Sequence, residues 1–214
     1  MAHDLVIRGG IVVDGTGLAR RRADVAIEGG RIAAVGFVSE REPALRTLDA
    51  DGLVVAPGII DLHTHYDPQL TFDPWATSSC YHGVTTVVAG NCGFSIAPTR
   101  VVDRPYTQAL FAAVEGMAPV ALDGVSWDFE SFPQYLAARA KRLGVNLSCY
   151  VGHSSVRRFA MGKEASERAA TRDEIAQMRR LVREAMAAGA AGFSSSHAPT
   201  QVDGAGVPIA SRFS

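Results

Sequence analysis

Apolar and polar positions divide the chain into two regions with different periods. Residues 4–56 hold short apolar runs separated by Gly and Asp residues at short intervals, and they show no helical period. Turn residues at this spacing favour antiparallel strands joined by tight turns. From residue 57 onward, short apolar runs alternate with longer amphipathic stretches. That pattern predicts strands alternating with helices, and therefore a parallel sheet.

The second region contains four predicted strands and two clear helices. One helix begins after a Ser cap at Ser131 and stops at Gly144. The other begins with Thr171 and Glu174 at capping-box spacing and stops at Gly189. Its apolar stripe consists of Ile175, Met178, Val182 and Met186. The strands are expected at 58–63, 83–90, 145–152 and, with a weaker pattern, 190–196.

These elements predict an α/β chain with a β-rich module at 1–56 and about four β/α units at 57–214. A closed (β/α)8 barrel needs eight strands and about 250 residues. If the second region is a barrel, the chain therefore stops halfway and leaves its last strand with an unpaired edge. An open doubly wound sheet is the structural alternative.

Composition and charge narrow the functional classes. The chain has 214 residues, of which 47% are hydrophobic and 20% charged, as is usual for a globular protein. A net charge of −1 and the lack of a Lys/Arg stripe give no support for nucleic-acid binding. No apolar run approaches the roughly 20 residues of a membrane span, and no signal peptide is evident. Three cysteines without CxxC spacing suggest free thiols or metal ligands, so we expect a cytoplasmic protein.

Candidate metal ligands stand where two predicted strands end. His63 and His65 close the first strand and, being two residues apart, share one face of it. Cys92 follows the second strand in "GNCG", 27 positions after His65, which is about one β/α unit. Imidazole and thiolate are both good zinc ligands. The alternatives are two histidines that face loops and a structural cysteine in a tight turn.

The segments "VVAPGIIDLHTHYDPQ" and "GVTTVVAGNCGFS" resemble the amidohydrolase superfamily, and within it the N-acyl-D-amino-acid deacylases. "VGHSSVRRFAMG" and "GAAGFSSS" are similar to the same branch. The resemblance implies a composite β-sandwich module beside the first half of a distorted (β/α)8 barrel. It also implies one or two zinc ions held by His63, His65 and Cys92. Many amidohydrolases bridge two ions with a carboxylated lysine, but Lys141 and Lys163 are not at strand ends, so Cys92 is expected to bridge.

The rest of the family's site has no counterpart in this sequence. The resemblance implies two further histidine ligands and a general-base aspartate from later strands. We therefore expect no catalytic residue in this chain, no amide hydrolysis by the chain alone, and a second polypeptide or a missing C-terminal half that completes the barrel. Zinc would activate a water molecule for attack on a linear amide such as an N-acyl amino acid.

Four other residues are candidates for contact with a small-molecule amide substrate. They are Asp67, His153, Ser195 and His197. Loop capping by Asp67, a backbone contact by His153 and simple exposure of His197 are the alternatives. An arginine could bind a substrate carboxylate, but the sequence does not select among Arg100, Arg157 and Arg158.

Three other interpretations also fit the sequence. The chain could belong to a cyclic-amide hydrolase of the hydantoinase or dihydroorotase kind, against which the cysteine of "GNCG" counts. It could be a non-catalytic subunit that keeps half of an enzyme fold. It could also be a truncated fragment.

Overall fold

The computed structural model describes residues 2–140 and 142–213, and the chain divides into two compact units, 1–58 and 59–214. Lys141, considered above as a bridging ligand, lies outside the described residues. The domain boundary expected between residues 56 and 57 stays a prediction. No helix among the described residues is both long enough and apolar enough to span a membrane.

The first unit contains a mixed five-stranded sheet. Its strands are β1 (Leu5–Val12), β2 (Arg21–Glu28), β3 (Arg31–Gly36), β4 (Thr47–Asp49) and β5 (Val54–Val55). The expected antiparallel pairing is confirmed for β1 with β2 and for β2 with β3. It is wrong for β4 and β5, which both run parallel to β1. The reason is the connection after β3, which carries the chain to the opposite edge of β1 instead of reversing it beside β3.

A small core holds this sheet together. The side chains of Val6, Ala26 and Val38 are buried against one another. The described residues of the unit contain this one sheet, so the composite β-sandwich stays a prediction.

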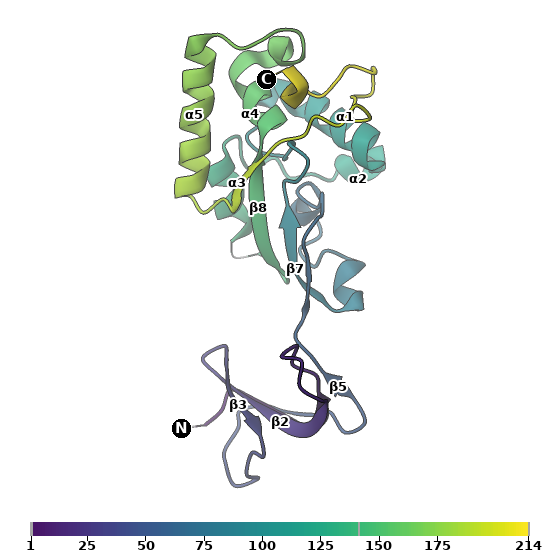
Figure 1. Cartoon of the computed structure of the whole chain (residues 1–214), viewed down its shortest axis with the longest axis vertical. Coiled ribbons are helices and arrows are strands. Elements are labelled where there is room, and N and C mark those ends of the chain that lie inside the picture. Colours follow the sequence, from purple (N-terminus) through teal and green to yellow (C-terminus); the bar gives the residue numbers. More distant parts are fainter. Residues whose placement is uncertain (1, 141, 214) are drawn as a thin grey trace. The chain divides into compact units, whose positions relative to one another are not determined.

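The second unit is built on four parallel strands that pair in chain order. The two central strands, Val84–Ala89 and Asn146–Gly152, lie side by side in Figure 1. The four strands are β6 (Ile59–Asp61), β7 (Val84–Ala89), β8 (Asn146–Gly152) and β9 (Gly192–Ser194), and all four predicted strands are confirmed. A doubly wound sheet reverses its strand order at a switch point. The uninterrupted order β6-β7-β8-β9 is instead that of a barrel whose chain advances in one direction.

The α-helices follow β7 and β8, whereas short 3-10 helices lie between β6 and β7. The α-helices are α1 (Arg104–Glu115), α2 (Pro119–Leu122), α3 (Phe132–Arg139), α4 (His153–Met161) and α5 (Arg172–Ala187). Short 3-10 helices span Gln69–Thr71, Ser79–His82, Val101–Asp103, Gly162–Ser166 and Ala210–Phe213. The main core joins them to the sheet through buried side chains that include Phe94, Phe111, Phe132, Tyr135 and Val151.

Both predicted helix starts are confirmed, whereas one of the predicted ends is wrong. Ser131 and Thr171 each form a capping box, in which the cap hydroxyl accepts the N–H group three residues later. α5 ends just before Gly189, as expected. α3 ends at Arg139 and not at Gly144, because the chain turns away so that the Gly144 N–H donates to the carbonyl of Pro74 at 2.8 Å.

The predicted stripe of α5 is buried only in part. Met178 and Val182 pack against the core, but Ile175 and Met186 remain 45% and 46% exposed. The deepest positions of the helix are Leu181 and Ala185. The predicted helical period of α5 is therefore correct. Its buried face, however, is rotated around the helix axis toward Leu181.

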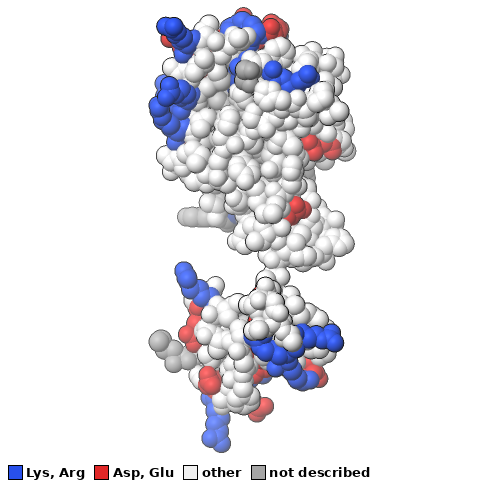
Figure 2. All heavy atoms as spheres, in the orientation of Figure 1, with Lys and Arg blue, Asp and Glu red and all other residues white. Residues whose placement is uncertain are grey.

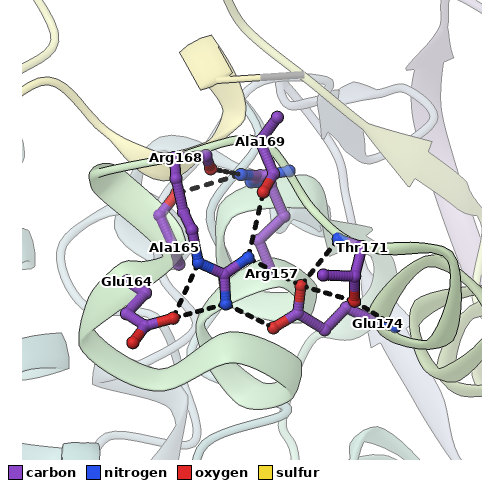
Figure 3. Close-up of polar contacts among 7 residues, drawn as sticks. All are labelled: Arg157, Glu164, Ala165, Arg168, Ala169, Thr171 and Glu174. Atoms are coloured by element: carbon purple, nitrogen blue, oxygen red, sulfur yellow. Dashed lines mark hydrogen bonds and ion pairs between the residues drawn. The ribbon is translucent and has the colours of Figure 1, made fainter.

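A polar network joins the segment after α4 to the start of α5 (Figure 3). Arg168 forms ion pairs with Glu164 and Glu174, and the latter carboxylate also accepts the Thr171 N–H at 2.7 Å. The buried Arg157 donates to the carbonyls of Ala165 and Arg168 at 3.1 and 3.0 Å. The cap of α5 and the arginine that anchors α4 thus depend on the same short segment.

Replacing Thr171 by Ala should lower the free energy of unfolding of the second unit by about 1 kcal/mol, because the first turn of α5 loses its cap. Thr171→Ser is the matched control, since it keeps the hydroxyl. Trp75 and Trp127, the two tryptophans of the chain, both lie in this unit, so their fluorescence during urea unfolding reports it selectively. Equal stabilities of the Ala and Ser variants would contradict a capping role.

Candidate metal centre

His63, His65 and Cys92 come together at the carboxyl ends of β6 and β7. One donor atom from each side chain lies within 4.8 Å of the donor atoms of the other two. The Nε2 atom of His63 is 3.1 Å from the Sγ atom of Cys92. The structure therefore brings the three predicted ligands into one cluster.

Hydrogen bonds between the two strand ends hold this arrangement. Thr64 donates its N–H and its hydroxyl to the carbonyl of Val88, both at 2.9 Å. The Asn91 side chain donates to the carbonyls of Thr64 and Val88 at 3.1 and 2.8 Å. Asn91 precedes Cys92, so its amide fixes the cysteine turn directly to the histidine strand.

The cysteine turn requires glycine on both sides. Cys92 itself has a φ of 54°, in the left-handed region that non-glycine residues rarely adopt. A Cβ on Gly90 would lie 2.0 Å from the carbonyl oxygen of Tyr150, and one on Gly93 would lie 2.9 Å from the nitrogen of Ser196. Such backbone strain concentrates at functional sites, where the surrounding structure enforces it.

At neutral pH the cluster offers the uncharged imidazole of His65 beside a protonated thiol. Burial, with a smaller contribution from His63, lowers the pKa of His65 to about 4. The ring of His65 stacks on Phe94 at a centroid distance of 4.9 Å, and its buried Nδ1 atom has no hydrogen-bond partner in the described part of the chain. Burial raises the pKa of the Cys92 thiol, against a hydrogen bond from Gln201 that lowers it. Forming the thiolate at neutral pH would therefore need a nearby cation.

Asp67 lies inside the unit, next to the metal loops. Its side chain is fully buried, and one carboxylate oxygen accepts the N–H of Gly90 at 3.1 Å. The hydroxyl of Tyr135 donates to its backbone carbonyl at 3.1 Å. Burial raises the pKa of this carboxyl to about 6. These contacts connect the loop after β6 to the cysteine turn, and a substrate contact by Asp67 stays a prediction.

The other three predicted pocket residues gather at the ends of β8 and β9. His153 Nδ1 is 2.9 Å from the hydroxyl oxygen of Ser195, and its ring lies 5.2 Å from that of Phe193. His153 is half-buried, whereas Ser195 and His197 are exposed. Burial, with smaller contributions from Arg157 and His197, lowers the pKa of His153 to about 4.

None of the three arginines considered for a substrate carboxylate is free of intramolecular polar contacts. Arg100 and Arg158 both bind the buried carboxylate of Asp103 at 2.8 Å through their Nε atoms. Arg157 is buried and donates to backbone carbonyls, as described above. The structure therefore gives all three arginines a role in holding the fold.

Three residues close to the cluster were not predicted from the sequence. Ser194 accepts the N–H of Gly93 at 3.1 Å, and Gln201 contacts the thiol of Cys92. The Oε1 atom of Glu115 lies 3.5 Å from the Nε2 atom of His65. The serine run that begins with the last residue of β9 was a usable signal, but nothing near Glu115 or Gln201 in sequence connects them to the site.

Two hollows in the second unit are lined by candidate site residues. A hollow of about 220 Å³ contains His63, His65 and Glu115. A larger groove of about 750 Å³ lies between α4, α5 and β9, is mainly apolar, and includes His153 and Arg157 but none of the three cluster residues. Figure 2 shows positive side chains along α5, whose exposed arginines are Arg172, Arg179, Arg180 and Arg183.

The amidohydrolase family profile matches residues 46–207, and the chain belongs to this family. The sequence-based resemblance is thereby confirmed.

Two relatives identify the branch of the family. A D-aminoacylase from Alcaligenes xylosoxydans xylosoxydans is 45% identical over 195 residues, and an N-acyl-D-glutamate deacylase from the same organism is 43% identical over 195 residues. Each match covers 90% of this chain and 37% of the relative. The chain therefore spans little more than a third of the length of these two proteins.

Solved structures confirm the expected fold of a β-rich module with the first half of a barrel. The N-acyl-D-glutamate deacylase of Bordetella bronchiseptica, solved with zinc and a phosphonate inhibitor, matches with a TM-score of 0.74 and 39% identity over 91% of this chain and 38% of its own. A D-aminoacylase studied for its binuclear metal centre matches with a TM-score of 0.76 and 40% identity over 93% of this chain and 40% of its own. An L-hydantoinase from Arthrobacter aurescens, 21% identical with a TM-score of 0.51, shares the fold alone.

Replacing His153 by Asn should make the second unit less sensitive to acid. Between pH 6.5 and about 4 the unfolded chain binds a proton at His153 that the folded chain does not, so stability is lost as the pH falls through this window. Asn can keep the contact with Ser195 but cannot titrate. We expect the loss of unfolding free energy between pH 7 and pH 4 to be smaller by about 1–2 kcal/mol, after discounting for partial exposure.

The measurement is urea unfolding followed by tryptophan fluorescence at the two pH values. His82→Asn is the matched control, because His82 is exposed. A His153→Asn profile that runs parallel to that of the unmodified chain would show that His153 does not cause the acid sensitivity.

Proposed function

We propose that this chain contributes half of the active site of a zinc-dependent hydrolase that cleaves linear amides, such as N-acyl-D-amino acids. The observation that carries the proposal is the cluster of His63, His65 and Cys92, whose donor atoms lie within 4.8 Å of one another. Its position at the carboxyl ends of adjacent parallel strands is where barrel enzymes keep their chemistry. The similarity to D-aminoacylase and N-acyl-D-glutamate deacylase supports the amide class.

The donor set fits zinc. Two imidazole nitrogens and a thiol sulfur are typical zinc ligands, and a sulfur can bridge two ions. Among the described residues the buried Nδ1 of His65 has no hydrogen-bond partner, and the ring is held by stacking on Phe94. Lys163 lies in the 3-10 helix after α4, away from the strand ends, and a lysine bridge is therefore not part of the proposal.

Bound zinc would supply a water molecule of lowered pKa and would polarise the amide carbonyl. The residues of this chain would hold the metal ligands and orient them. Thr64 and Asn91 keep the two ligand loops in register, and Asp67 ties the histidine loop to the cysteine turn. We assign His153, Ser195 and His197 to the side of the pocket that receives the substrate, where an imidazole and a hydroxyl can hydrogen-bond to amide or carboxylate groups.

The general base and the remaining ligands are proposed to lie outside these 214 residues, in a further part of the same polypeptide or in a second one. The chain spans 37% of its two relatives, and in the structure β9 pairs on one side with β8. We accordingly propose that the 214-residue chain alone does not turn over an amide. The free state of Cys80, Cys92 and Cys149 supports a cytoplasmic location. A cyclic-amide hydrolase is less well supported, because the hydantoinase similarity is limited to the fold.

Replacing Cys92 by Ser should reduce zinc affinity at least tenfold, because a hydroxyl is a much weaker zinc ligand than a thiolate. Native mass spectrometry of the purified chain, with metal analysis of the same sample, gives the stoichiometry, and calorimetric titration gives the affinity. Cys80→Ser is the matched control, since Cys80 lies outside the cluster.

We expect one or two zinc ions in the unmodified chain, removal by a chelator, and no hydrolysis of N-acetyl-D-amino acids by the chain alone. Unchanged zinc binding by Cys92→Ser would refute the metal centre. Turnover by the isolated chain would refute the requirement for a further segment or partner.

A further inference from the structure

Glu115 places a carboxylate beside the metal cluster from an unrelated part of the chain. It is the last residue of α1, some 50 positions after the histidines, and it lines the same 220 Å³ hollow as His63 and His65. Its Oε1 atom is 3.5 Å from the Nε2 atom of His65. Its side chain is 23% exposed, and the side chain of His65 is 10% exposed.

The C-terminal end of α1 is electrostatically unfavourable for the Glu115 carboxylate when no cation is nearby. The carbonyl groups at the carboxyl end of a helix carry a partial negative charge, which disfavours an anion there. α1 ends at Glu115 and is followed by Gly116 in the left-handed conformation, so the carboxylate stands at that negative end. Among the described residues, no lysine or arginine forms an ion pair with Glu115. A half-buried charge without a partner costs free energy.

The contact with His65 does not compensate this cost. At 3.5 Å it is longer than an ordinary N–H···O hydrogen bond. Nearby lies Cys92, whose thiolate would add a second negative charge when it forms. A divalent cation among two imidazoles, one thiolate and one carboxylate would instead give a site with no net charge.

Resting on the proposed function, we propose that Glu115 is a further protein ligand of the metal ion that His63, His65 and Cys92 hold. The carboxylate lies outside the set of donor atoms within 4.8 Å, so the flexible Glu115 side chain must turn toward the ion to bind it. Glu115 would thus be the ligand that the helix after β7 supplies, in addition to those that the strand ends supply.

Glu115→Gln tests this by removing the charge while keeping the shape, and Glu167→Gln is the matched control, because Glu167 is exposed and follows α4. The 214-residue chain is titrated with Zn²⁺ by calorimetry and with Co²⁺ by absorption, and the melting temperature of the metal-free form is measured. We expect Glu115→Gln to weaken metal binding by about 10–100-fold. We also expect it to raise the melting temperature of the metal-free form, because an uncompensated charge is removed. Glu167→Gln should change neither quantity.

The outcomes separate the two proposals. If the unmodified chain binds neither Zn²⁺ nor Co²⁺, the proposed function fails, and the role of Glu115 fails with it. If the unmodified chain binds metal and Glu115→Gln binds it equally well, only the role of Glu115 is overturned. A lower melting temperature of metal-free Glu115→Gln with unchanged affinity would show a purely structural contact with His65. Should Glu115→Gln not fold, Glu115→Asp retains the charge on a shorter side chain, and it must also weaken binding for the proposal to stand.

Discussion

The parallel pairing of β6 with β7 is the constraint on which the candidate site depends. It aligns the carboxyl ends of two strands that are separated by more than 20 residues of chain, and hydrogen bonds from Thr64 and Asn91 then fix one end to the other. Without this pairing, His63 and Cys92 would stand on independent loops. With it, a short histidine motif and a strained cysteine turn become one cluster of donor atoms.

The three candidate ligands are held in place by residues that are not themselves candidate ligands. Gly90 lets the cysteine turn pass against the backbone of Tyr150, and the buried carboxyl of Asp67 holds the N–H of Gly90. Phe94 supports the ring of His65 by stacking. A metal site needs ligands that are already oriented, because ordering them at the moment of binding would consume part of the affinity. The sheet, the turn and the aromatic contact supply that orientation together.

Much of this arrangement was predictable from local sequence signals. The strand positions, the caps at Ser131 and Thr171, and the grouping of His63, His65 and Cys92 follow from periodicity, cap chemistry and spacing. The errors occur where a distant partner decides the conformation. β4 and β5 run parallel to β1 because the chain crosses to the free edge of the sheet. α3 ends before the predicted residue because the Gly144 N–H donates a hydrogen bond to the carbonyl of Pro74.

The sequence by itself determined the α/β class, the positions of the four strands of the second unit and the two helix caps. It also singled out His63, His65 and Cys92, which the family resemblance made candidate ligands. The strand positions and the caps depend on residue types within a few positions of one another, and local backbone and capping preferences act at that range. Only the tertiary structure decided that Glu115 stands beside His65, that Gln201 reaches the thiol of Cys92, and that Arg100, Arg157 and Arg158 are engaged within the fold. Such contacts join residues brought together by packing of whole helices on the sheet, and no local pattern in the chain records where that packing places an individual side chain.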